Sequence, residues 1–189
     1  MRIILFFVVV LAVASPRIFA QNGGAKEKPA SAVSPSEEMV RLWKEIHRKL
    51  IAMAEDFPEE KLDFRGQKEQ RTFAENLLHV AGEDYRMISA IKGEQVGWHG
   101  SGDPARADFK TREDIVRLLK QATADGEKVI TQQGDEGLSR EIKYPYGNRM
   151  VHASYGWSDI IEHAGEHYGQ LVVYYRINQL IPPESRLQK

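Results

Sequence analysis

Two histidines four residues apart provide the strongest chemical signal in the sequence. His163 and His167 lie in IEHAGEHYGQL, a stretch whose apolar residues recur at helical spacing. On an α-helix this separation places both imidazoles on one face, about 6 Å apart along the axis, where they can reach one ion. They share that sector with Gln170 and Tyr174 and are flanked by apolar residues, so we expect them to face inward. A metal ion and a hydrogen-bond network would both satisfy buried imidazole nitrogens, and the pair alone leaves both readings open.

The composition limits which chemistry the chain can perform. Of its 189 residues, 42% are hydrophobic and 28% are charged, which is typical of one ordinary globular domain that can bury a core. There is no cysteine, so disulfides, thiolate ligands and cysteine nucleophiles are excluded together. The net charge of −1 without a basic block argues against nucleic acid as a partner.

The first twenty residues are typical of a secretory signal peptide. Arg2 is followed by an apolar run over residues 3–13, and small residues lead up to Ala20. We expect cleavage before Gln21, export to the periplasm or the medium, and no stable membrane insertion afterwards. An uncleaved membrane anchor is the alternative. Residues 21–34 are rich in Gly, Ala, Ser and Pro and predict a flexible linker.

Four helices are expected in the remaining domain, residues 35–186. Ser34, Thr72 and Thr111 each precede an acidic residue by three positions, which is the pattern of a capping box at a helix start. The fourth helix is expected from near Ser158 to Ile181, before two prolines. Four helices of similar length predict an all-α four-helix bundle.

Two connections in this bundle are unusually long. Residues 93–110, between helices two and three, are Gly-rich and long enough to cross the bundle. Residues 134–157, between helices three and four, hold two short β-like runs around Tyr146-Gly147-Asn148, which predict a small hairpin. Its aromatic residues Tyr144 and Tyr146 could pair with a second copy, so we expect a homodimer.

Two motifs resemble those of the DinB/YfiT-like family. Residues 161–171 resemble its closing motif, in which H-x-x-x-H is followed by Gly-Gln-Leu, and residues 77–84, LLHVAGED, resemble its second-helix motif. The resemblance extends over roughly residues 35–186. It implies a four-helix bundle that holds one divalent metal ion through His79, His163 and His167.

The inward position of His79 is implied by the resemblance alone. Its neighbours on the same helical face include Glu75, Glu83 and Arg86, whereas the large apolar residues lie well around the helix. Helical periodicity by itself would leave His79 at the edge of the wet face.

Several polar residues near the histidines are candidates for the chemistry. Glu83 and Glu166 could accept a proton or orient a ligand, and Asp159 flanks the histidine sector; a solvated helix carboxylate is the alternative for all three. Gln170 and Tyr174 could contact substrate, although a packed core with a satisfied hydroxyl explains them equally well.

The other three histidines are expected to be ordinary. His47 lies beside Trp43 and Ile46 on the first helix, which predicts a half-buried packing residue. His99 and His152 fall in the two long connections and are expected to be loop histidines.

The function follows from the metal that the resemblance implies. Three neutral imidazoles leave positions for water and substrate, and Zn²⁺ held this way lowers the pKa of bound water towards about 7. Zinc is the expected ion, while Ni, Fe and Mn also suit such a site. The family implies hydrolases and transferases of low-molecular-weight thiols. Because those thiols are cytoplasmic, expected export favours a hydrolase. A metal-loaded binding or stress module without turnover is the alternative.

Overall fold

The computed structural model describes residues 33–94 and 102–186. The expected signal peptide, nearly all of the linker and His99 lie outside the described residues. The elements, in chain order, are α1 (Pro35–Asp56), the 3₁₀ turn η1 (Glu59–Lys61), α2 (Phe73–Lys92), α3 (Arg112–Ser139), β1 (Glu141–Lys143), β2 (Met150–His152), α4 (Ala153–Ile177) and α5 (Pro183–Arg186).

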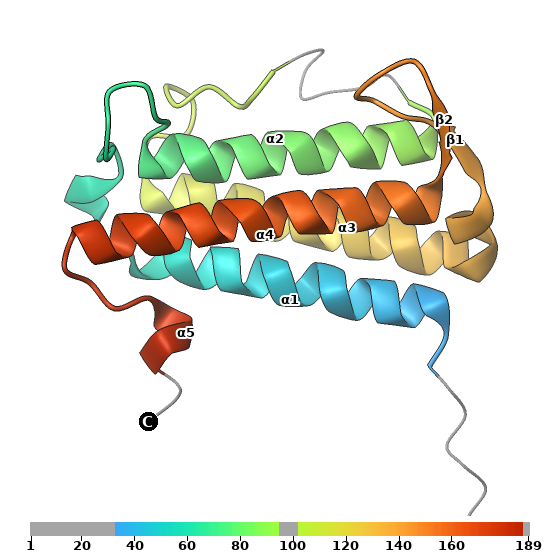
Figure 1. Ribbon diagram of the computed structural model, residues 1–189, viewed down its shortest axis with the longest axis horizontal. Helices are drawn as coiled ribbons and strands as arrows, with labels where there is room; N and C mark the ends of the chain where they lie inside the picture. Colours follow the sequence, from blue (N-terminus) through green and yellow to red (C-terminus); the bar gives the residue numbers. More distant parts are fainter. Residues whose placement is uncertain (1–32, 95–101, 187–189) are drawn as a thin grey trace, which may run out of the picture. The chain divides into compact units, whose positions relative to one another are not determined.

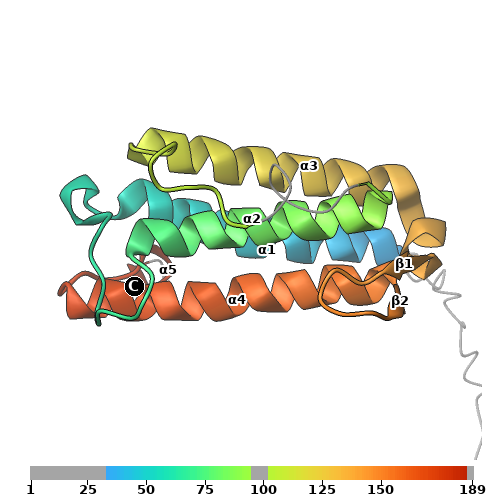
Figure 2. The same ribbon diagram turned by 90° about the horizontal axis from the view of Figure 1, so that it is seen from above.

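Four long helices lie side by side and confirm the predicted bundle. α1 and α2 each pack against both α3 and α4 (Figures 1 and 2). α2 and α3 run in the same direction, opposite to α1 and α4. The chain must therefore return along the bundle between α2 and α3, which explains why that connection is long. Within the described ranges, no helix has the length and apolarity needed to cross a membrane.

The predicted starts of α1, α2 and α3 are confirmed by their capping contacts. The side chains of Ser34, Thr72 and Thr111 each accept a hydrogen bond from the backbone three residues on, and the acidic residue there bonds back. These reciprocal bonds satisfy backbone N–H groups that a helix start leaves free. α2 ends at Gly93, whose φ of 74° is accessible to glycine without a side-chain clash.

The predicted hairpin between α3 and α4 is present, but its connection is shorter than expected. α3 continues past a kink at Gly134 (φ 57°) to Ser139, and α4 begins at Ala153, several residues before Ser158. The strands β1 and β2 are antiparallel, and the Ala153 N–H donates to the Arg140 carbonyl at 2.8 Å. Strand pairing therefore leads directly into α4.

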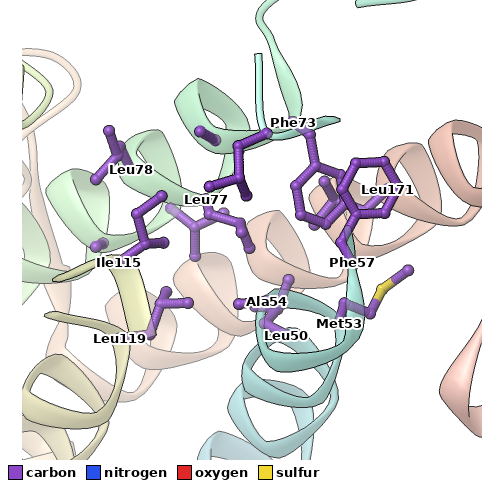
Figure 3. Packing of buried hydrophobic residues seen from close by; sticks show 14 of the residues in the cluster. Leu50, Met53, Ala54, Phe57, Phe73, Leu77, Leu78, Ile115, Leu119 and Leu171 are labelled. Atoms are coloured by element: carbon purple, nitrogen blue, oxygen red, sulfur yellow. The ribbon is translucent and has the colours of Figure 1, made fainter. Parts of the chain in front are cut away.

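Two apolar clusters fill the interior, one towards each end of the bundle. In the first, Phe57 and Phe73 stack with ring centroids 3.8 Å apart, and residues of α1 to α4 surround them (Figure 3). The second contains Trp43 and Trp157, whose rings meet edge to face at 5.4 Å.

His47 lies between these clusters, and its predicted role as a half-buried packing residue was wrong. Its side chain is fully buried beside that of Asp84, with 2.9 Å between Nε2 and Oδ2. Helical periodicity could not predict this contact, because the partner is on another helix, 37 positions away.

Candidate metal centre

Three histidines from two adjacent helices converge on one point. His79 comes from α2, whereas His163 and His167 come from successive turns of α4. Nε2 of His163 lies 3.2 Å from Nε2 of His79 and 3.1 Å from Nε2 of His167. Two nitrogens that bind one ion at about 2.0–2.1 Å lie roughly 2.9–3.4 Å apart, at angles from square to tetrahedral. The spacing of these nitrogens therefore suits a shared ion.

Hydrogen bonds on the outer nitrogens set the tautomers of two rings. His79 Nδ1 donates to Asp103 Oδ1 at 2.9 Å, and His167 Nδ1 donates to the side-chain oxygen of Asn76. Both acceptors are oxygens, so in the neutral ring the proton is on Nδ1 and the lone pair is on Nε2. Outer partners of this kind orient metal-binding histidines in proteins. Two lone pairs thus point at the same place.

The third ring shows that these residues fit a divalent ion. Nδ1 of His163 is buried and has no hydrogen-bond partner among the described residues. If its Nε2 carried the proton, that proton could satisfy only one of the two facing lone pairs well. A cation would bind the Nε2 lone pairs of all three rings at once.

Electrostatics keep two of the rings neutral, as metal ligands must be. Burial lowers the pKa of His167 to about 3, assisted by the nearby rings of His163 and His79 and by Arg71. The pKa of His163 is also lowered, first by burial and then by the positive charge that His79 would carry.

Gly82 allows the segment that carries Asp103 to approach α2 closely. A Cβ on Gly82 would lie 2.9 Å from Cδ of Pro104 and 3.3 Å from Cα of Asp103. This glycine stands one turn beyond His79, so its missing side chain lets the carboxylate reach the ring. The close packing of this segment therefore explains the glycine in LLHVAGED.

A cavity of about 440 Å³ opens beside the histidines. Its lining residues are His79, Glu83, Tyr146, Asp159, Ile160, Glu162, His163 and Glu166. All three candidate carboxylates (Glu83, Asp159 and Glu166) thus line it. Glu83 is only 8% exposed, which differs from the solvated side chain held as its alternative.

Tyr146 is a cavity residue that the sequence did not reveal. Its hydroxyl donates to Glu83, 63 positions earlier in the chain, and Tyr144, which is 7% exposed, donates to Asp159 at 2.8 Å. We expected both tyrosines at a homodimer contact. They make contacts within this chain, and the homodimer stays a prediction.

Gln170 and Tyr174 face a different cavity, of about 630 Å³, that also includes Arg71 and Asn76. Gln170 accepts a hydrogen bond from Asn76 at 3.3 Å, and the Tyr174 hydroxyl donates to the carbonyl of Arg71 at 2.5 Å. Gln170 is therefore connected to His167 through Asn76. His152 ends β2, where its Nδ1 contacts the Ser139 carbonyl at 2.9 Å.

The fold and the site together indicate the class of protein: a four-helix bundle in which the second and fourth helices hold a group of three histidines. The sequence profile of the DinB superfamily matches residues 42–171, well over half of the chain. The chain belongs to the DinB superfamily.

Solved structures support the same fold at low identity. A DinB-like protein of Bacillus cereus is 16% identical, with a TM-score of 0.65 over 78% of this chain and 95% of that one. YfiT of Bacillus subtilis, described as a probable metal-dependent hydrolase with an unusual four-helix-bundle topology, is 14% identical, with a TM-score of 0.61 over 81% and 94%. A mycothiol-dependent maleylpyruvate isomerase is 18% identical, with a TM-score of 0.56 over 72% and 60%. No curated protein matches the chain.

Proposed function

We propose that the chain is an exported metal-dependent hydrolase that uses one divalent ion, with zinc as the expected element. The observation that carries this proposal is the convergence of three Nε2 atoms at the edge of a cavity, with two rings oriented from outside by Asp103 and Asn76. The description of YfiT as a probable metal-dependent hydrolase agrees with it.

His79, His163 and His167 would hold the ion. When bound, such an ion supplies Lewis-acid chemistry and makes a coordinated water more acidic. An N₃ donor set also suits Ni, Fe or Mn.

Glu83 is the best-placed proton acceptor. It lines the cavity with two of the histidines, is largely buried, and is held by Tyr146 Oη and by Arg86, whose Nε is 3.3 Å from Glu83 Oε1. In hydrolysis, Glu83 would take the proton that the attacking water releases and return it to the leaving group as the substrate bond breaks. Glu166 is more exposed and is the second candidate.

A thiol-dependent transferase or isomerase is the second candidate function. It is favoured by the structural likeness to the mycothiol-dependent isomerase. Export, which rests on residues 1–20 alone, argues against it because such thiols are cytoplasmic. N-terminal sequencing of protein from the native compartment should begin at Gln21 if this part of the proposal holds.

Elemental analysis of protein purified from its native compartment tests the proposal. We expect one divalent ion per chain and hydrolysis of esters or amides by the loaded form. Turnover only with an added thiol would favour the second candidate, whereas a loaded protein without any turnover would favour a binding module. A chain that takes up no ion would overturn all three.

The Gly82→Ala variant should bind the ion more weakly although no ligand is changed. The added Cβ would displace Pro104 and Asp103, and the loss of an outer partner of a metal-binding histidine typically costs about 10–100-fold in affinity. The metal Kd, measured by competition with a chromophoric chelator, checks this.

Gly165→Ala is the matched control for that measurement. Gly165 lies between the two histidines of α4, yet a Cβ there would meet nothing within 4 Å. Its affinity should stay unchanged, and its helix should gain up to about 1 kcal/mol. Equal affinities of both variants would contradict the role given to Gly82.

A further inference from the structure

The cavity beside the histidines is lined by acidic groups. Four carboxylates line it (Glu83, Asp159, Glu162 and Glu166), and no lysine or arginine of the described chain does. Two of the converging histidines line the same cavity, so the carboxylates face the candidate reaction centre and not merely solvent.

Most of this negative charge lacks a nearby cation. Glu83 is paired with Arg86 at 3.3 Å, and Asp103, behind His79, is paired with Arg71 at 3.6 Å. Glu162 and Glu166 take part in no ion pair in the part of the chain that the structure describes. Asp159 is likewise without one there, and accepts only the hydroxyl of Tyr144.

A divalent ion would not neutralise this cavity. With neutral imidazoles, the ion brings two positive charges, which face the three carboxylates that lack a cation. One negative charge remains. The cavity therefore attracts cations even when the centre is loaded.

The remaining walls suit a small organic cation. Ile160 and the ring of Tyr146 supply apolar and aromatic surface, and the volume of about 440 Å³ is in the range of small-molecule sites. An aromatic ring beside carboxylates is a favourable environment for an ammonium group.

We infer that the substrate carries a positive charge: a small ammonium-bearing molecule whose charged group lies among Asp159, Glu162 and Glu166 while its reactive group faces the histidines. This inference rests on the proposed function and adds the class of substrate. It also predicts that anionic substrates are rejected, because like charges in the same cavity repel.

Three metal-binding probes of different charge test the inference. Acetohydroxamate, glycine hydroxamate and succinate monohydroxamate share one metal-binding group but carry no further charge, an ammonium and a carboxylate, respectively. Binding to the Zn²⁺-loaded protein is measured by calorimetry at low salt. We expect the ammonium probe to bind roughly tenfold more tightly than the neutral one, and the carboxylate probe more weakly than both. The preference should shrink at high salt because two of the carboxylates are exposed.

A matched pair of double variants locates the effect. Glu162→Gln with Glu166→Gln should remove most of the preference, whereas Glu38→Gln with Glu136→Gln removes the same charge from exposed positions outside the cavity lining and should keep it. Equal binding of the three probes to loaded protein would overturn the inference, as would an equal loss in both double variants. If the variant with Glu162→Gln and Glu166→Gln fails to take up metal, the wild type still tests the inference. A preference of the wild type for the ammonium probe that does not depend on salt would overturn the inference. A wild-type chain that binds neither Zn²⁺ nor another divalent ion would instead refute the proposed function.

Discussion

Replacement of His163 by alanine is expected to remove most of the bound metal. His163 is the central member of the group, because its Nε2 is within 3.2 Å of both other Nε2 atoms. Removal of one of three ligands should cost more than the roughly 10–100-fold that is lost with an outer partner. His79→Ala and His167→Ala should behave alike, since three ligands leave little redundancy.

Metal content after dialysis and thermal unfolding with and without Zn²⁺ would check this result. An ion that binds only the folded chain stabilises it by about 2.7 kcal/mol at a hundred times its Kd. The wild type should gain in this way and the three variants should not. His152→Ala is the control, because His152 is exposed and its side chain is hydrogen-bonded, among the described residues, to the Ser139 carbonyl alone.

One outcome would assign the metal to a different group of residues. His79 also forms a group with Glu83 and Asp103 whose potential ligand atoms lie within 4.8 Å of one another. If His163→Ala kept its metal while His79→Ala and Glu83→Gln lost theirs, the ion would belong to that group. If every histidine variant bound as the wild type does, the three histidines would be a hydrogen-bonded cluster only.

Replacement of Asp84 by alanine is expected to destabilise the fold by about 3–5 kcal/mol, the usual cost of leaving a buried charge without its partner. Both nitrogens of the His47 ring face acceptors: Nδ1 is 2.7 Å from the Trp43 carbonyl and Nε2 is 2.9 Å from Asp84. Two acceptors require two N–H donors, and a histidine ring has two N–H groups only when it is protonated. Chemical denaturation measures the loss, and Glu136→Ala, an exposed carboxylate, should change stability by less than about 0.5 kcal/mol.

The loss should depend on pH in a definite direction. Burial alone would lower the pKa of His47, but the charge and hydrogen bond of Asp84, with the Trp43 carbonyl, raise it above the ordinary 6.5. A raised folded pKa gives stability that is complete below the unfolded pKa and is lost as pH rises through the folded one. The difference between wild type and Asp84→Asn should therefore be largest in acid and shrink above neutral pH. A difference that grows with pH, or stays under about 1 kcal/mol throughout, would contradict the buried ion pair.

Local sequence patterns predicted much of the fold and placed two of the three histidines on one helical face. Capping boxes and breakers marked the starts of α1, α2 and α3 and the end of α2, because capping is a contact between residues three or four apart. The start of α4 was placed five residues too late, since it has no capping box and follows from strand pairing. The spacing of His163 and His167 placed them together for the same reason, since one helical turn brings them to one face. His79 needed the family resemblance, because its own helix surrounds it with polar neighbours.

Tertiary structure alone decided what lies around those histidines. The contacts of His79 with Asp103, of His167 with Asn76, and of Glu83 with Tyr146 join residues 24, 91 and 63 positions apart. Periodicity reports only which face of a helix is apolar, so it could show neither the buried partner of His47 nor the acidic cavity. Those depend on how α2 and α4 pack and on where the hairpin between α3 and α4 lies, and such long-range geometry leaves no regular spacing in the sequence.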